Sequence, residues 1–425
     1  MIDLNERFGG KKILIWGYGR EGKSTETFFK KHPVFDSFDI SEAKPDEIDY
    51  DKYDYIFKSP GIRLSQPTAE GFSHGRVSEA SAHDFKKITS QTELFIEAFS
   101  DRIIGITGTK GKSTTTSLMH HVLEKCFEGT DRTAHLVGNI GVPCLDYFDR
   151  MAESDDIAVF ELSCHQLAYT DVSPHVAIFL NLYEDHLDFY GDRETYFQAK
   201  KHITDFQKEN DLLFVGTDVP KIDTMAKVTT VTDRYVSDEM KILGEHNHYN
   251  AQFVMQVAKD VYGLDEAAVK SAIDEFKGLP HRLEFVTEKD AVRYYDDSIS
   301  TIPEATIQAI KSIPDVGTVL VGGMDREIDY TPLLEYIPTR KDIHFILMYA
   351  SGKRIYEELK SGCDLNNNAG SDADNIIVVD DLKQAVAKAK EITEKGKACV
   401  LSPAAASYGY FKNFEERGDM FKSLV

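Results

Sequence analysis

The sequence lacks the features that mark membrane, secreted and disulfide-bonded proteins. No apolar run in its 425 residues approaches the roughly 18–20 residues of a spanning helix, which excludes membrane insertion. The N-terminal stretch MIDLNERFGGKK has no apolar core of a secretory signal. The five cysteines are scattered and form no CxxC pair, which argues against a disulfide scaffold and a structural zinc site. We therefore expect a cytoplasmic protein.

Positive charge is also scarce, because 49 Lys and Arg face 71 Asp and Glu and leave a net charge of −22. Nucleic-acid phosphates are bound by clustered Lys and Arg, so this balance argues against a nucleic-acid partner. It does not exclude anionic small molecules, since a few amides and cations in a cleft can override the global field. A hydrophobic content of 42% excludes a disordered chain, and the length predicts about two to four domains.

Short β-branched apolar runs alternate with longer amphipathic stretches, which is typical of parallel α/β proteins. We predict three segments, at residues 1–95, 96–277 and 278–425. The first strands of the first two are expected at 12–16 and 103–107. The third begins at the turn GLPHR, where Gly and Pro interrupt a helical pattern.

The strongest local signal is GITGTKGKSTTT at Gly105–Thr116, between an apolar strand and an amphipathic helix. Loops of small residues let backbone amides approach phosphates, and the next helix adds its positive end. Lys112 can reach the β- and γ-phosphates, and a following hydroxyl can bind Mg²⁺. Ile106 replaces the first glycine of the usual pattern, so a turn without a ligand is the alternative. The context predicts ATP, bound by Gly108, Thr109, Lys110, Gly111, Lys112, Ser113 and Thr114.

A second glycine pattern, GYGREG at Gly17–Gly22, directly follows the first strand. It is typical of phosphate binding at a helix N-terminus, with Asp39, about twenty residues further on, as a ribose partner. Many α/β proteins use the same turn for close packing of helix on strand. A nucleotide-bearing substrate explains both glycine loops better than NAD, because the other loop already takes the triphosphate.

Two metal-ligand candidates, Glu161 and His186, lie at or just past the ends of apolar strands, where open α/β sheets bind ligands. Beside a triphosphate both are reasonable Mg²⁺ ligands. Taken singly, Glu161 could be a capping carboxylate and His186 a core histidine. By default Lys200 is a solvated helix lysine, and Asn139 and Asn250 are turn or cap residues.

Together these segments resemble the Mur ligases, the ATP-dependent amino-acid-adding enzymes of peptidoglycan precursor synthesis. TGTKGKST at Thr107–Thr114 is similar to the family's TGTxGKS/T loop, which accounts for the missing glycine. Further motifs follow in the family's order: GNIG (138–141), ELS (161–163), EDHLD (184–188), YFQAK (196–200), HN…N (246, 247, 250) and LPHRLE (279–284). SPGI (59–62), DSxS (297–300) and LSPAAASYGYFKNFEERG (401–418) are most similar to the branch that adds D-glutamate.

The resemblance implies a Rossmann-like N-terminal domain for the UDP part of the substrate, a central P-loop domain for ATP, and a Rossmann-like C-terminal domain for the amino acid. It implies UDP-N-acetylmuramoyl-L-alanine, glutamate and ATP as substrates, an acyl-phosphate intermediate and two Mg²⁺ ions. We expect a monomer.

Site roles follow by matching motif positions. Ser113, Glu161, His186 and a carbamylated Lys200 would hold Mg²⁺. The expected catalytic set is Lys112, Glu161, His186 and Lys200. Asn250, Arg282 and Asp297 would hold the adenine, phosphate and ribose of ATP. Asn139 and His186 would contact the muramoyl-alanine, and Ser407 and Phe414 would contact the glutamate. The residues expected to line the uridine-diphosphate pocket are Gly17, Arg20, Glu21, Asp39 and Gly61.

Two departures bear on the amino acid. Many D-glutamate-adding members have a lysine where this chain has Ile299. Where some relatives have a Gly-Lys pair, this chain has Asp325 and Arg326. Arg326 could clamp a substrate carboxylate in bidentate fashion. The alternatives are therefore the same reaction with L-glutamate or another amino acid, a nucleotide-dependent binding protein without ligase activity and, on the first glycine loop alone, a dinucleotide oxidoreductase.

Overall fold

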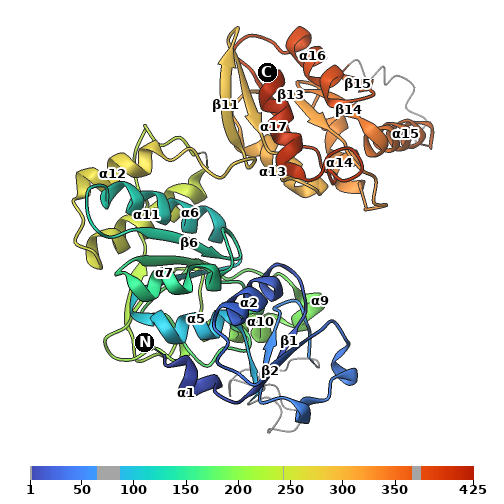
Figure 1. Cartoon of the computed structure of the whole chain (residues 1–425). Coiled ribbons are helices and arrows are strands. Elements are labelled where there is room, and N and C mark those ends of the chain that lie inside the picture. Colours follow the sequence, from blue (N-terminus) through green and yellow to red (C-terminus); the bar gives the residue numbers. More distant parts are fainter. Residues whose placement is uncertain (1, 65–86, 243, 366–374) are drawn as a thin grey trace. The chain divides into compact units, whose positions relative to one another are not determined.

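The computed structural model describes residues 2–64, 87–242, 244–365 and 375–425 (Figure 1). Three sheets of mostly parallel strands confirm the α/β class. The chain divides into two compact units, residues 1–239 with 245–275, and residues 240–244 with 276–425. The first two sheets lie in the first unit and the third sheet in the second.

The first sheet is parallel, in the order β2-β1-β3-β4. Its central strand carries the apolar run KILIW and is buried beyond its first residue. The glycine pattern forms the tight turn from this strand into α2, where a Cβ on Gly22 would lie 2.1 Å from the carbonyl oxygen of Gly17. The bounds are α1 (Leu4–Phe8), β1 (Lys12–Trp16), α2 (Arg20–Lys31), β2 (Ser37–Ser41), β3 (Tyr55–Lys58), β4 (Ile88–Thr89) and α5 (Gln91–Phe99).

The second sheet has the order β10-β9-β8-β5-β7-β6, also parallel throughout. β5, β7 and β8 are fully buried, as expected for strands covered on both faces. Helix α6 packs against α11 and α12 (Figure 1), and α10 packs against β5 and α8. The strands are β5 (Ile103–Thr107), β6 (Ala134–Gly138), β7 (Ile157–Glu161), β8 (Val176–Phe179), β9 (Leu212–Gly216) and β10 (Lys227–Val231). The helices are α6 (Lys112–Cys126), α7 (Phe148–Glu153), α8 (Cys164–Leu167), α9 (Leu187–Tyr190), α10 (Arg193–Asp205), α11 (Glu245–Asp260) and α12 (Glu266–Glu275).

The third sheet has the order β11-β12-β16-β13-β14-β15, with only the β11–β12 pair antiparallel. Apolar clusters cover both of its faces. The strands are β11 (Glu284–Lys289), β12 (Val292–Asp296), β13 (Val316–Val321), β14 (His344–Met348), β15 (Ile376–Val379) and β16 (Ala398–Leu401). The helices are α13 (Pro303–Ser312), α14 (Thr331–Tyr336), α15 (Tyr349–Leu365), α16 (Leu382–Ile392) and α17 (Phe414–Leu424). None of the helices in the described ranges combines the length and apolarity needed to cross a membrane.

Candidate active site

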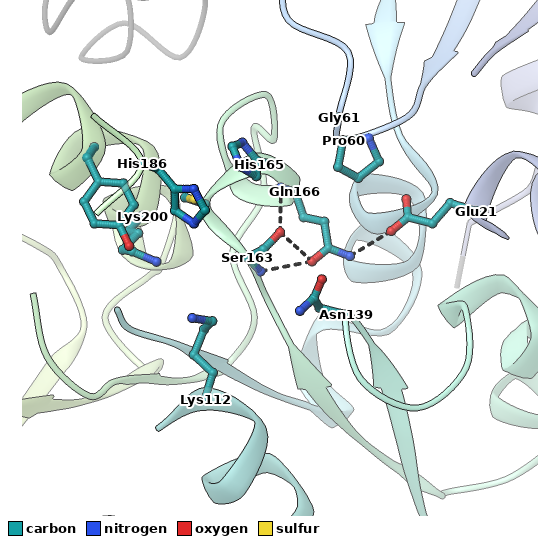
Figure 2. Close-up of a pocket in the computed structure, with 12 residues that line it drawn as sticks. Glu21, Pro60, Gly61, Lys112, Asn139, Ser163, His165, Gln166, His186 and Lys200 are labelled. Atoms are coloured by element: carbon teal, nitrogen blue, oxygen red, sulfur yellow. Dashed lines mark hydrogen bonds between the residues drawn. The ribbon is translucent and has the colours of Figure 1, made fainter. Parts of the chain in front are cut away.

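A cavity of about 380 Å³ lies at the carboxyl edge of the central sheet (Figure 2). This is the edge at which parallel sheets bind ligands. Lys112, His186 and Lys200 lie on one side of the cavity and Glu21 and Pro60 on the other. The lining residues are Glu21, Pro60, Gly61, Lys112, Asn139, Ser163, Cys164, His165, Gln166, His186, Tyr196 and Lys200.

The glycine loop after β5 contains backbone conformations that favour glycine. Gly108 and Gly111 have φ angles of +153° and +84°, which L side chains rarely adopt. Lys112 opens α6 and folds back, with its Nζ donating to the carbonyl oxygens of Gly108 (2.9 Å) and Thr109 (3.0 Å). Burial lowers the pKa of Lys112. Ser113 and Thr114 follow in the first turn of α6, where a helix favours anions.

Two asparagines flank this loop. Asn181, just past β8, accepts from the backbone amides of Thr109 and Lys110 through its Oδ1, at 3.1 and 2.9 Å. Sequence analysis missed it, although it opens the segment NLYEDH that carries His186. Asn250 is buried in α11 beside the loop, since a Cβ on Gly111 would lie 2.8 Å from its Oδ1. Asn250 donates to the Oδ1 of Asn247 at 3.0 Å.

Glu161 ends β7 and is 1% exposed. Its Oε1 accepts from the Nδ2 of Asn139 at 2.8 Å, whereas its Oε2 has no hydrogen-bond partner in the described part of the chain. A buried carboxylate oxygen without a partner is costly unless a cation or donor satisfies it. The orphaned oxygen therefore fits a metal ligand.

His186 takes up the left-handed conformation, with φ +54°, and caps α9. Its ring lies against those of His165 and Tyr196, with centroids 5.1 and 6.0 Å away. Cys164, His165 and His186 each offer one ligand atom, and these atoms lie within 4.8 Å of one another. The imidazole and thiol groups of this cluster line the same cavity as Lys200.

Lys200 is 1% exposed, which excludes the solvated-lysine alternative. Helix α10 packs against β5 and α8 and places this side chain in the cavity wall. The Nζ donates to the carbonyl oxygen of Gly108 at 2.8 Å and lies 4.7 Å from the centre of the Tyr196 ring. Burial lowers the pKa of Lys200 to about 7.

Only some of the residues matched to uridine diphosphate lie at the cavity. Gly61 and Glu21 line the cavity, and Arg20 bonds to the turn that carries Asn139. Gly17, with φ +90°, forms the β1–α2 turn. Asp39 lies on β2 and its Oδ2 accepts from Lys52 Nζ (2.6 Å) and Tyr53 Oη (2.8 Å), outside the cavity lining.

Within the second unit, the expected amino-acid and ATP residues gather at the carboxyl edge of the third sheet. Asp297, Arg326 and Ser407 follow β12, β13 and β16, which are neighbouring strands. The amide of Met324 donates to the carbonyl oxygen of Ala406 at 2.8 Å, joining the last two loops. Arg282 and Arg326 are exposed, Ser407 is buried and Phe414 opens α17.

Asp297 is 2% exposed and accepts from the hydroxyls of Ser300 and Ser402 at 2.6 and 2.7 Å. Burial raises the pKa of this carboxyl to about 6. The segment after Asp297 is fixed by Arg417, a fully buried arginine that the sequence analysis missed. Its guanidinium donates to the hydroxyl and carbonyl of Ser298 (3.0 and 2.7 Å) and to the carbonyl of Ala405 (3.0 Å).

Replacing Arg417 by methionine is expected to lower the free energy of unfolding by about 3 kcal/mol, because it leaves buried carbonyls without donors. Alanine at Arg340, a partly exposed arginine paired with Asp342 at 2.7 Å, should cost only about 1 kcal/mol. Urea denaturation of both variants checks this. A loss below about 1 kcal/mol in the Arg417 variant would show that its hydrogen bonds contribute little to stability.

A glycine-rich loop between a buried strand and a helix, at the carboxyl edge of a central parallel sheet, is the arrangement by which α/β proteins of the nucleotide-binding class hold phosphates. The Mur ligase middle domain matches residues 106–233. A UDP-N-acetylmuramoylalanine–D-glutamate ligase of Latilactobacillus sakei subsp. sakei (strain 23K) is 31% identical over 91% of this chain and 86% of its own length. The enzyme of that name from Aquifex aeolicus (strain VF5) is also 31% identical, over 97% and 98%.

Solved structures agree in fold. The MurF ligase of Thermotoga maritima, in complex with ADP, has a TM-score of 0.55 at 16% identity, covering 99% of this chain and 96% of its own. The UDP-N-acetylmuramate–alanine ligase MurC of the same organism has a TM-score of 0.54 at 17% identity, covering 97% and 98%. The chain belongs to the Mur ligase family. It is an ATP-dependent ligase of peptidoglycan synthesis.

Proposed function

We propose that the protein joins D-glutamate to UDP-N-acetylmuramoyl-L-alanine, coupled to cleavage of ATP to ADP and phosphate. The relatives that cover most of the chain carry this activity in their name. The observation that carries the proposal is the convergence of Lys112, His186 and Lys200 on one cavity at the carboxyl edge of the central sheet. We assign the UDP part of the substrate to residues 1–95, ATP to 96–277 and the amino acid to 278–425, in a monomeric enzyme.

The reaction proceeds by two displacements. The alanyl carboxylate oxygen attacks the γ-phosphorus, and the bond between the γ-phosphorus and the β-phosphate oxygen breaks. ADP departs, and the alanyl group becomes an acyl phosphate. The neutral amine of glutamate then attacks the acyl carbon, phosphate leaves with the carboxylate oxygen, and the amine loses its proton. The Lys112 ammonium and the amides of residues 108–114 stabilise the charge on the transferring group. A carboxylate nucleophile needs no base, so the first step asks only for positioning and charge.

The donor set suits Mg²⁺. Ser113, Glu161, His186 and a carbamylated Lys200 would hold the two ions, and the orphaned Oε2 of Glu161 supports this assignment. Bound Mg²⁺ neutralises charge on the phosphates. Asn139, bonded to Glu161, contacts the muramoyl-alanine together with His186.

Carbamylation of Lys200 is consistent with its surroundings. A neutral amine must attack the carbon of CO₂, forming an N–C bond and releasing a proton. Burial holds the pKa of Lys200 at about 7, so a large share of the amine is neutral at physiological pH. The product carries carboxylate-like oxygens, which Mg²⁺ prefers to an ammonium group.

In the C-terminal part, Ser407, Phe414 and Arg326 are the proposed glutamate contacts, and Asp297, Arg282 and Asn250 those of ATP. The bond between Met324 and Ala406 supports a common pocket for Arg326 and Ser407. A guanidinium can hold a substrate carboxylate through two parallel hydrogen bonds, which a lysine cannot do. Arg326 would thereby take the role of the lysine in the Gly-Lys pair of some relatives.

Phosphate release from Mg²⁺-ATP tests this function, with UDP-N-acetylmuramoyl-L-alanine present and with D-glutamate, L-glutamate or no amino acid added. We expect release with D-glutamate alone. A preference for L-glutamate would change the specificity and direct attention to Ile299 and Arg326. Release that is independent of both would contradict the ligase assignment and leave an ATP-binding protein with another acceptor.

A further inference from the structure

Two segments at the carboxyl edge of the central sheet place polar groups at the cavity. The 138–141 turn follows β6 and carries Asn139, and the 163–166 segment, which is Ser163 and the start of α8, follows Glu161 at the end of β7. The side-chain bond from Asn139 to Glu161 (2.8 Å) joins the 138–141 turn to β7, as does the bond from the Asn139 amide to the Glu161 carbonyl (3.1 Å). Glu161 therefore lies between the two segments, and contacts that hold both segments restrain its carboxylate.

Arg20 holds the 138–141 turn from a distant part of the chain. Its guanidinium donates to the carbonyl oxygens of Gly138 (3.0 Å), Asn139 (3.1 Å) and Gly141 (3.2 Å). Gly138 and Gly141 have φ angles of +104° and +81°, and a Cβ on either would lie 2.5 Å or less from a backbone oxygen. The turn is thus tightly constrained, and a single planar fork satisfies three of its carbonyls.

Glu21, the next residue, contacts the 163–166 segment. Its Oε1 accepts from the Nε2 of Gln166 at 2.9 Å, and the Oε1 of Gln166 accepts from the amide and hydroxyl of Ser163, both at 3.0 Å (Figure 2). Gln166 is buried and Glu21 is partly buried. Further along α2, Ser24 donates to Asp146 at 2.6 Å, which docks the helix against the segment after the first turn.

Together with the backbone of residues 161–163, these bonds close a ring that runs from Arg20 through Asn139, Glu161, Ser163 and Gln166 to Glu21. We propose that Arg20 and Glu21 are positioning residues, which set the Asn139–Glu161 pair from the start of α2 instead of binding the diphosphate of the substrate. This rests on the proposed function for its kinetic consequence, but the ring itself is a property of the apoprotein. The first sheet thereby controls the geometry of the catalytic edge of the second.

Two substitutions separate positioning from diphosphate binding. Arg20→Lys keeps the positive charge but has a single ammonium head that cannot reach three carbonyls. Arg20→Ala removes both the positive charge and the three hydrogen bonds to the turn. Lys23→Ala is the matched control, because Lys23 is an exposed cation on the same helix. A diphosphate ligand would be largely preserved in Arg20→Lys, whereas a positioning residue would be lost in both variants.

Amide hydrogen exchange of the free protein gives the first readout. We expect exchange at Asn139, whose amide is bonded to the Glu161 carbonyl, to rise roughly tenfold in Arg20→Ala and Arg20→Lys and to stay unchanged in Lys23→Ala. Far-UV circular dichroism confirms that each variant is folded. Unchanged exchange in both Arg20 variants overturns the proposal, whether or not the protein is a ligase.

Kinetics give the second readout. We expect kcat to fall roughly ten- to hundredfold in both Arg20 variants, with KM for the UDP substrate changed less than about twofold. A raised KM with unchanged kcat, relieved in Arg20→Lys, would overturn the proposal and make Arg20 a diphosphate ligand. If the wild-type protein shows no ligation, the proposed function fails, and hydrogen exchange alone decides the role of Arg20.

Discussion

Replacing Lys112 by alanine is expected to lower turnover by roughly 10³-fold or more while leaving the fold intact. The ammonium lies at the glycine loop, with its Nζ 2.9 and 3.0 Å from two loop carbonyls, beside the site that we propose for the phosphates of ATP. Its removal leaves the charge of the transferring phosphoryl group without its main protein cation. Steady-state phosphate release measures the loss.

The control is Lys125→Ala, at the far end of the same helix, where the lysine pairs with Glu128 at the surface (3.3 Å). This variant should keep wild-type turnover. Matching circular dichroism spectra and melting temperatures establish that the Lys112 variant is folded. Near-normal activity of a folded Lys112→Ala protein would contradict the assignment of this loop to ATP.

Replacing Lys200 by alanine is expected to cost roughly 10²- to 10³-fold in turnover, because the variant lacks the oxygen donor that a carbamate would provide. Small carboxylates added to the assay should partly restore activity, since they can enter the space that the side chain leaves and supply an anionic oxygen. Titration with acetate and formate measures this rescue.

The matched control is Lys201→Ala, one residue further on, where the Nζ pairs with Asp205 at 2.6 Å. That variant should retain activity and show no response to carboxylates. An active Lys200→Ala enzyme would show that Lys200 has only a structural role, as a donor to the Gly108 carbonyl. Loss of activity without rescue would contradict the carbamate and leave the residue's buried amine as the functional group.

Local signals predicted the strand, loop and helix around the glycine pattern. The segment Gly105–Thr116 spans the end of a buried strand, a run of small residues and the start of a helix whose first residue is Lys112, so the pattern depends only on neighbours in the chain. Glu161 was also predictable, because it ends an apolar run and so falls at the edge of the sheet. Neither needed a contact between distant segments.

Other features depend on contacts that no local pattern encodes. The sequence around Lys200 is that of an ordinary amphipathic helix, and its burial follows only from the packing of α10 against β5 and α8. Arg20 meets carbonyls 118 to 121 residues away, and Arg417 meets a serine 119 residues before it. Resemblance to a family assigns a matched position to a ligand, but it does not say which backbone groups that side chain meets.

The transfer of a labelled oxygen tests the central claim most directly. UDP-N-acetylmuramoyl-L-alanine carrying ¹⁸O in its alanyl carboxylate is incubated with the enzyme, Mg²⁺-ATP and D-glutamate, and the released phosphate is analysed by mass spectrometry. The proposed route through an acyl phosphate predicts one ¹⁸O atom in each phosphate released with product. Unlabelled phosphate, released alongside the amide, would show that the carboxylate never attacks the γ-phosphorus and would contradict the account.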